Sequence, residues 1–552
     1  MGITMITRNI LNSQQGVATL IALIMVGMLI LIGLAAISMT DDEVSIAGNE
    51  LQEMRAFYAA EAGLERAGAA MQAEYDSTGM PPTVLPSGTD SLNNAEVVYT
   101  TTDDGPATQR ELTVGTLAGL HAQVKSFSLT SIAINGVDQA KVEMSQSFET
   151  ALVPIFQFAV FYGQDLEIDP GPNMSLIGRV HSNGNMYLNP ASNLTMDSYV
   201  TASGKILVGA KGSDPLKSGN ILIKDPSGNY VTMKQGGNTY DNDHPDWYDS
   251  SVSMWGGRVQ DEAHGQGELN VPLSGSDDPH KLIERATGNP DSYEHKATLK
   301  IVDGIVLQKQ GDGTWQDVTA NMVADGVITY TSDEFYDARE GEWIDCTELD
   351  VEAMYDNGYA PLNGVMYFSD DISGGSEFPA LRLLNGDELD DGLTVACENP
   401  LYTMGNFNSV NKKPAAFLSD AYTVMSASWD DSKSTLSKWN RYAQSTTVNA
   451  SYITGGVETG PGVESGGFHN LPRFLEVWSG RTFSWKGSSV HIWYSEQATA
   501  PWRPEGGGYY SAPTRNWQYD TDLDNPNSLP PETPCVRVFQ RTGWKQEYVS
   551  YE

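Results

Sequence analysis

The pattern of hydrophobic and polar residues divides the chain into stretches of different character, and the first stretch is the most apolar. From Val17 to Ile37 the sequence VATLIALIMVGMLILIGLAAI contains no charged residue. As a helix rising ~1.5 Å per residue, it is long enough to cross the ~30 Å hydrocarbon core of a bilayer. Arg8 is the only charged residue before this stretch, and an acidic run, Asp41 to Glu43, follows it. By the positive-inside rule, we expect a single-pass inner-membrane protein whose bulk is exported.

Three interpretations of this stretch compete. A secretory signal peptide would be cut near Leu34-Ala35-Ala36, where small residues mimic a cleavage site. A plain membrane anchor would keep its whole N-terminus. A prepilin would lose a leader of residues 1–16 by cleavage after Gly16 and keep the apolar helix. The position of Gly16 at the junction between the polar and apolar segments favours the prepilin.

The apolar run continues into an amphipathic pattern. Phe57, Ala60, Leu64, Ala67 and Met71 recur at spacings of three and four residues, which places them on one stripe of a helix. The sequence therefore predicts a long helix over 17–75, whose first half crosses the membrane and whose second half packs against a sheet.

Residues 13–71 resemble the N-terminal segment of the PilX family of type IV pilus minor pilins. The matching features are the QQG junction, the aliphatic run, the acidic residues after it and the block FYAAEAGLERA from Phe57 to Ala67. The resemblance implies processing by a prepilin peptidase, assembly with other minor and major pilins, and a pilus or cell-surface location after assembly. It covers about a tenth of the chain and leaves open whether the filament is a pilus or a secretion pseudopilus.

One position departs from the pattern of major pilins. Cleavage after Gly16 makes Val17 the first mature residue and Ile21 the fifth, where major pilins carry Glu. Such a carboxylate can neutralise the terminal ammonium of a neighbouring subunit in the apolar filament core, where an unpaired charge is costly. Because Ile21 cannot do this, we expect the subunit at the start of a filament, at or near its tip, with a role in assembly and surface adhesion.

β-type sequence follows the predicted helix. The segment 76–92 contains three prolines and no periodicity, and is interpreted as a linker. In the region 93–154, the stretches Ala122 to Ile134 and Val137 to Phe148 alternate around Asn135-Gly136, a hairpin signal. We expect a small antiparallel sheet here, packed on the helix as in a pilin.

The region 155–230 has another rhythm, in which glycine precedes short aliphatic runs. The pattern recurs at Gly184 to Leu188, Gly204 to Val208 and Gly219 to Ile223. Short strands at loosely regular spacing are typical of a small β-helix, although an antiparallel sheet with glycine turns fits the pattern nearly as well.

All twelve tryptophans and all three cysteines lie in the remaining region, 231–552. We expect a large, aromatic-rich, mixed α/β head with long glycine-rich loops, and a fold of the α+β class overall. Its aromatic residues are interpreted as core first and as an adhesive face second. Cys346, Cys397 and Cys535 allow one disulfide, and the sequence does not say which two would pair.

Composition limits the function classes. With a net charge of −38, the chain repels nucleic acid, so no nucleic-acid partner is expected. The sequence has no phosphate-binding loop, HExxH motif or GxSxG motif, which favours a structural protein over an enzyme. The alternative is an exported, membrane-anchored binding protein or hydrolase that enters no filament.

No cofactor is certain, but acidic clusters suggest calcium. Asp520, Asp522 and Asp524 alternate in a loop and offer the oxygen ligands that a hard cation needs. The pattern departs from an EF-hand, because no glycine stands at the sixth position and Pro526 interrupts the loop. A weaker cluster comprises Asp241, Asp243, His244, Asp246 and Asp249.

Overall fold

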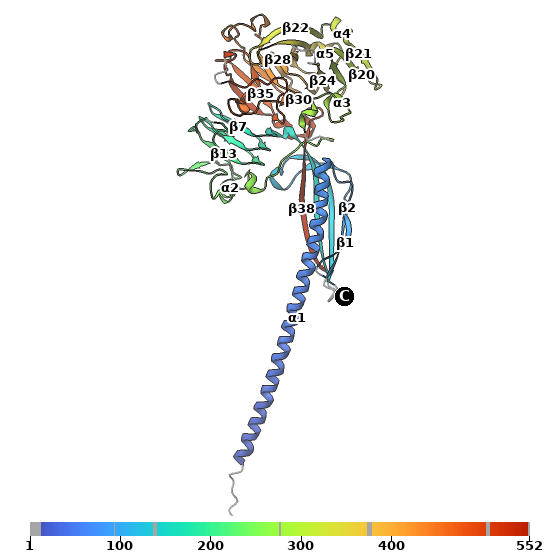
Figure 1. The fold of residues 1–552 in the computed structure, drawn as a ribbon, viewed down its shortest axis with the longest axis vertical. Helices are drawn as coiled ribbons and strands as arrows, with labels where there is room; N and C mark the ends of the chain where they lie inside the picture. The colour runs from blue at the N-terminus through green and yellow to red at the C-terminus, as the bar shows by residue number, and fades with distance from the viewer. Residues whose placement is uncertain are drawn as a thin grey trace, which may run out of the picture.

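The computed structural model describes residues 13–92, 94–135, 141–212, 214–274, 278–286, 288–371, 378–503 and 508–549. Figure 1 shows a rod formed by helix α1 (Ser13–Thr78), a narrow sheet along one half of that rod, and a head at its far end. A long apolar helix followed by a large sheet-rich region confirms the expected fold class. Most of the predicted leader, residues 1–12 with Arg8, lies outside the described residues.

The helix and the narrow sheet together form the stalk. The sheet is antiparallel, in the order β1-β2-β4-β5-β38, with β3 paired to β4. Its core faces the predicted stripe of α1, because Ala60, Leu64, Ala67 and Met71 are all buried against it. The strands are β1 (Ser87–Leu92), β2 (Ala95–Asp103), β3 (Thr108–Glu111), β4 (His121–Asn135), β5 (Lys141–Pro154) and β38 (Cys535–Val549).

Two glycines let α1 approach the sheet closely. A Cβ added at Gly63 would lie 2.4 Å from Ser131 Oγ, and one added at Gly68 would lie 2.8 Å from Phe148 Cζ. Contacts this short do not occur between real side chains, so larger residues would push the helix away from the sheet.

The stalk corrects two sequence-based expectations. The segment 76–92 is not wholly a linker, because α1 continues to Thr78 and residues 87–92 form β1. The side chains of β1 are mostly exposed, so backbone pairing with β2 holds the strand and no alternating pattern marks it. The sheet also takes its last strand, β38, from the C-terminal end of the chain. The turn residue Gly136 lies outside the described residues.

The head begins with the predicted β-helix, here called the first stack. Its strands pair in parallel on three faces, and Met186 stands between Leu166 and Ile206 in one such ladder, with all three side chains buried. This confirms the β-helix over the antiparallel alternative. The faces are formed by β6 (Phe158–Tyr162), β9 (Arg179–Ser182), β12 (Val200–Ala202) and β18 (Val259–Gln260); by β7 (Leu166–Ile168), β10 (Met186–Leu188) and β13 (Ile206–Val208); and by β8 (Met174–Leu176), β11 (Leu194–Met196) and β14 (Ile221–Lys224).

The three glycine-led repeats do not share one face. The first two lie on β10 and β13, which are neighbours, whereas the third lies on β14 and pairs with β11. Helix α2 (Trp247–Trp255) packs Trp247 and Trp255 into the core of the first stack. The smaller strands at its margin are β15 (Tyr230–Thr232), β16 (Lys234–Gln235) and β17 (Asn238–Thr239).

The rest of the head, expected to be a mixed α/β region with long glycine-rich loops, is a second β-helical stack. Parallel strands again build three faces. They are β24 (Val365–Ser369), β27 (Leu393–Cys397), β30 (Ala415–Ser419), β33 (Ser451–Thr454) and β36 (Ser489–His491); β23 (Glu342–Asp350), β25 (Pro379–Leu384), β28 (Leu401–Met404), β31 (Tyr422–Met425) and β34 (Arg473–Phe474); and β26 (Gly386–Glu388), β29 (Phe407–Val410), β32 (Thr446–Val448), β35 (Thr482–Gly487) and β37 (Thr514–Tyr519).

The two stacks join through one shared sheet. Strand β36, late in the chain, pairs in parallel with β6, the first strand of the first stack, so a twelve-stranded sheet crosses both. Each stack thereby covers a strand edge that would otherwise be open. At the outer end of the second stack lie β19 (Leu299–Val302), β20 (Ile305–Lys309), β21 (Trp315–Asp317), β22 (Ile328–Asp337) and the short helices α3 (Tyr293–Lys296), α4 (Thr319–Ala324) and α5 (Val351–Asp356).

Candidate functional site

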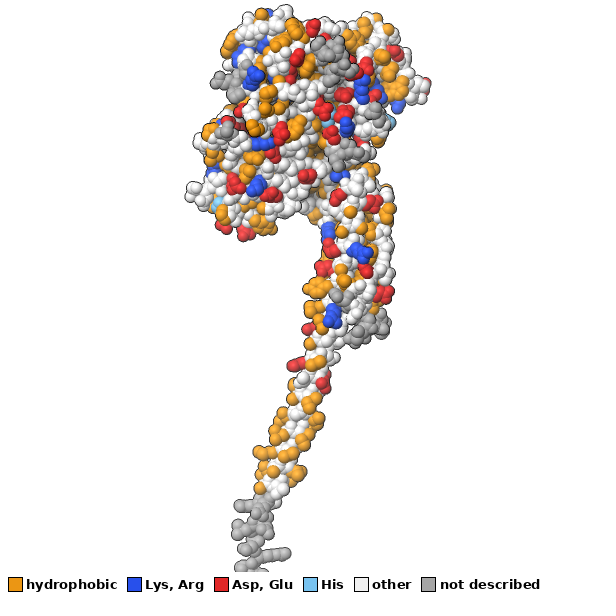
Figure 2. Space-filling model, viewed as in Figure 1, with side chains coloured by type: hydrophobic (Ala, Val, Ile, Leu, Met, Phe, Trp, Pro, Cys, Tyr) orange, Lys and Arg blue, Asp and Glu red, His pale blue; other side chains and the backbone are white. Residues whose placement is uncertain are grey.

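The first candidate surface is the half of α1 that extends beyond the sheet. Every residue from Val17 to Glu50 is exposed except Gly27, which is partly buried, and apolar side chains are spread over the lower rod in Figure 2. Its most apolar window has a mean hydropathy of 3.0 and is not buried at all within the structure. By length and composition, it is the one helix among the described residues that is suited to cross a membrane.

The predicted processing residues lie at the beginning of this surface. Gly16 and Val17 are already within α1, which starts at Ser13, and Ile21 is half exposed. The acidic run Asp41 to Glu43 does not interrupt the helix. The predicted membrane segment and the amphipathic segment are therefore one continuous rod, and cleavage after Gly16 stays a prediction.

The predicted calcium ligands face basic and phenolic groups instead of one another. Lys412 Nζ is ion-paired with Asp520 and lies 2.7 Å from Asp522 Oδ2, while Lys486 Nζ lies 3.1 Å from Asp520 Oδ1. The Lys412 ammonium lowers the pKa of Asp522. Asp524 accepts a hydrogen bond from Tyr519, at 2.8 Å. A lysine occupies the position that a cation would need, which disfavours calcium here.

The second acidic cluster is dispersed as well. Asp241 accepts a hydrogen bond from the backbone N–H of Val208 at 2.9 Å, and burial raises the pKa of its carboxyl. Asp243 lies 3.6 Å from Lys205 and is exposed. The cluster helps to close the end of the first stack, and its carboxylates do not converge on one point.

No disulfide forms among the three cysteines, all of which lie in described parts of the chain. Cys346, Cys397 and Cys535 are free thiols on β23, β27 and β38, three strands of three different sheets. Burial raises the pKa of the Cys535 thiol to about 11, so the reactive thiolate is scarce at neutral pH. The cysteines therefore serve as small apolar side chains.

One glycine-rich loop of the second stack, residues 455–467, is fixed to the first stack. Glu167 Oε1 accepts hydrogen bonds from Thr459 Oγ1 at 2.5 Å and from Ser465 Oγ at 2.9 Å. Lys211 lies beside this contact, 3.1 Å from Asp165 and 3.6 Å from Glu458. These polar contacts hold the loop of the second stack over the first.

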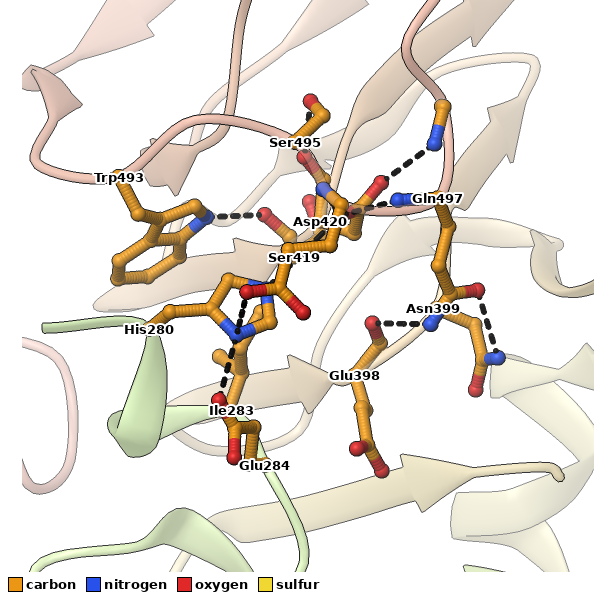
Figure 3. A network of polar contacts seen from close by, with 12 residues as sticks. His280, Ile283, Glu284, Glu398, Asn399, Ser419, Asp420, Trp493, Ser495 and Gln497 are labelled. Carbon is orange, nitrogen blue, oxygen red and sulfur yellow. Dashed lines mark hydrogen bonds and ion pairs between the residues drawn. The ribbon is translucent and has the colours of Figure 1, made fainter. Parts of the chain in front are cut away.

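A buried carboxylate organises the polar network drawn in Figure 3. Asp420, in the turn after β30, accepts three backbone N–H groups of the loop after β36: those of Glu496 (2.6 Å), Gln497 (3.1 Å) and Ala498 (2.9 Å). Its own carbonyl accepts a hydrogen bond from Ser495 Oγ at 2.7 Å. Hydrogen bonds from backbone donors satisfy a buried carboxylate well, so this loop is rigidly placed.

His280 joins this network from a different part of the chain. It lies on a short 3₁₀ helix, Pro279–Leu282, in the segment that connects the two stacks, and it points toward Glu284. Burial disfavours its charged form, but the carboxylates of Asp420, Glu284 and Glu496 outweigh that effect and raise the pKa of His280 to about 9. No pattern in the sequence marks this cluster, because its members are 76 residues or more apart except for His280 and Glu284.

Comparisons with known proteins add little. No model of a known protein family matches the chain, and no curated protein sequence matches it. Among solved structures, the chain is similar to the competence-associated pilin ComZ from Thermus thermophilus, with 13% sequence identity over 91% of this chain and 98% of that one, at a TM-score of 0.30. A TM-score this low does not establish a shared fold.

Proposed function

We propose that this chain is a minor-pilin-like subunit of a type IV pilus or a related pseudopilus. One observation carries the proposal: a single 66-residue helix is apolar and uncovered along one half, and packs its other half on an antiparallel sheet. The resemblance of residues 13–71 to the PilX family supports the same function.

The uncovered half of α1 needs an apolar environment. Leu23, Leu29 and Leu31 are each about two-thirds exposed, at 71%, 67% and 67%. Burial of apolar area is favourable by roughly 25 cal/mol per Å², so this surface strongly favours association over exposure to water. A bilayer covers it before assembly, and the helices of other minor and major pilins cover it in a filament. Release from the bilayer into a filament requires that the leader be removed, which is the task of a prepilin peptidase.

The shape of the head supports a position at the tip. In Figure 1 the second stack extends beyond the upper end of α1, where the preceding subunits of a shaft would have to lie, and the first stack lies to one side of that end. Ile21 also lacks the carboxylate that would neutralise a preceding subunit. A first subunit has no predecessor, so neither feature hinders it there. Adhesion through the exposed head is the accompanying proposal.

Labelling of the head on isolated filaments tests this function. We expect antibodies against the head to mark filament ends, and a Gly16→Leu variant, which blocks cleavage at the junction, to be absent from filaments. Head label along the whole shaft would refute the tip position. Filaments that never contain the chain, while it stays in the membrane, would favour the alternative of an anchored binding protein.

A further inference from the structure

Three metal-ligating side chains converge where the segment between the stacks meets the second stack. The ligand atoms of His280, Glu284 and Glu496 all lie within 4.8 Å of one another. His280 Nδ1 is 2.9 Å from Glu284 Oε1 and 3.8 Å from Glu496 Oε1. We propose that these three residues bind a divalent transition-metal ion, for which Zn²⁺ is the best match.

The other ring nitrogen of His280 supports this assignment. The side chain is almost fully buried, yet Nε2 has no hydrogen-bond partner within the described parts of the chain. It faces Asp420 Oδ1 at 3.9 Å, and Asp420 is itself held by backbone N–H groups. A metal-binding histidine commonly directs its second N–H at a carboxylate, which fixes the tautomer and the ring. With a metal on Nδ1, the Nε2 proton points at Asp420.

The two glutamates are oriented for the same centre. Lys281 is ion-paired with Oε2 of Glu284, which leaves Oε1 directed at the His280 ring. Glu496 is held through its backbone N–H by Asp420, while its side chain is 63% exposed. The centre is therefore open to solvent on one side, so an ion can enter and keep a water molecule as its fourth ligand.

The donor set selects the kind of metal. Imidazole nitrogen suits zinc and its neighbours, whereas calcium and magnesium prefer oxygen ligands only. Zinc bonds of ~2.0–2.1 Å place tetrahedral ligand atoms roughly 3.3 Å apart, which lies between the two distances seen from His280 Nδ1. A neutral histidine and two carboxylates also balance the charge of a divalent ion. Bound metal would clip the segment that carries His280 to the loop that carries Glu496.

Cobalt titration of the full chain in detergent tests the proposal, because Co²⁺ in such a site absorbs visible light and Zn²⁺ displaces it. We expect one equivalent of Co²⁺ to bind, and Glu496→Gln or His280→Gln to weaken binding at least tenfold. Glu496 is exposed, so its variant keeps the fold even if the histidine variant does not. Glu458→Gln is the matched control, because Glu458 is equally exposed at 63% and lies outside the cluster.

The outcomes separate a metal site from two alternatives. Loss of binding in the two cluster variants but not in Glu458→Gln supports the proposal. Absence of saturable Co²⁺ and Zn²⁺ binding would overturn it and leave the cluster as an ion pair between His280 and its carboxylates. Equal weakening in all three variants would also overturn it, because the acidic surface as a whole would then be attracting the ion.

Discussion

The packing of α1 on its sheet makes a sharp prediction about Leu64. This side chain is 2% exposed and lies in the stalk core together with Val97, Leu129 and Met144. Replacing a buried leucine by alanine costs about 2–5 kcal/mol, because contacts are lost and a cavity remains. Leu51 lies on the same helix but is 44% exposed, so Leu51→Ala should change stability by no more than about 0.5 kcal/mol.

Hydrogen exchange measured by mass spectrometry can localise this effect. The chain combines a stalk with two stacks, so one global unfolding curve would mix their contributions. Since about 1.4 kcal/mol corresponds to a factor of ten, Leu64→Ala should speed exchange of the stalk amides by about 30-fold or more. Amides of the second stack serve as an internal control and should exchange at an unchanged rate.

Two results would refute this reasoning. Equal acceleration by Leu64→Ala and Leu51→Ala would mean that the stripe of α1 does not form a core. Unchanged stalk exchange in Leu64→Ala, with normal protection of the sheet, would mean that the helix contributes little to holding the sheet together.

Three further predictions concern the head and the cysteines. Gly219→Ala places its Cβ within 2.3 Å of two backbone carbonyl oxygens and should lower the melting temperature, whereas Gly171→Ala meets nothing within 4 Å and should not. Acid should destabilise the head between pH 6.5 and about 4, because burial lowers the pKa of three histidines: His181 (about 4), His469 (about 3) and His491 (about 4). In this range the unfolded chain binds protons that the folded chain does not. The free energy of unfolding then falls by about 1.4 kcal/mol per histidine and pH unit. Calorimetry against pH checks the slope, and a flat melting temperature would contradict it. Alkylation of the denatured, unreduced chain should modify three thiols, and modification of only one would reveal a disulfide.

Much of the stalk could be predicted because its information is local. The uncharged run is long enough for a membrane-spanning helix, the stripe from Ala60 to Met71 has a helical period, and both lie where expected. The partner of β5 could not be found in this way. Strand β38 lies almost four hundred residues further along the chain, and nothing local marks it as the edge of that sheet.

The second stack could not be predicted either, because its repeat is not visible in the local sequence. In the first stack successive strands on one face are 20 residues apart, so Leu166, Met186 and Ile206 stand out as a repeat. In the second stack the turns between strands differ in length, and long insertions such as 426–445 hide the period. Several of its strands are also buried on both sides, as Leu393–Cys397 is, so those strands show no alternation.

In the candidate clusters, too, the local pattern could be seen in the sequence, but the partners from distant parts of the chain could not. Alternating aspartates at 520–524 suggested a cation, but the lysines that pair with Asp520 and Asp522 come from residues 412 and 486 and could not be foreseen. Likewise, His280, Asp420 and Glu496 meet only because the segment between the stacks folds back on the second stack.

The mature N-terminus tests the central claim most directly, namely that α1 stays on the protein and joins a filament. Intact-mass and N-terminal peptide analysis of the chain purified from filaments or membranes should give a product that begins at Val17. A product that begins beyond Ala36, without the apolar half of α1, would contradict the account.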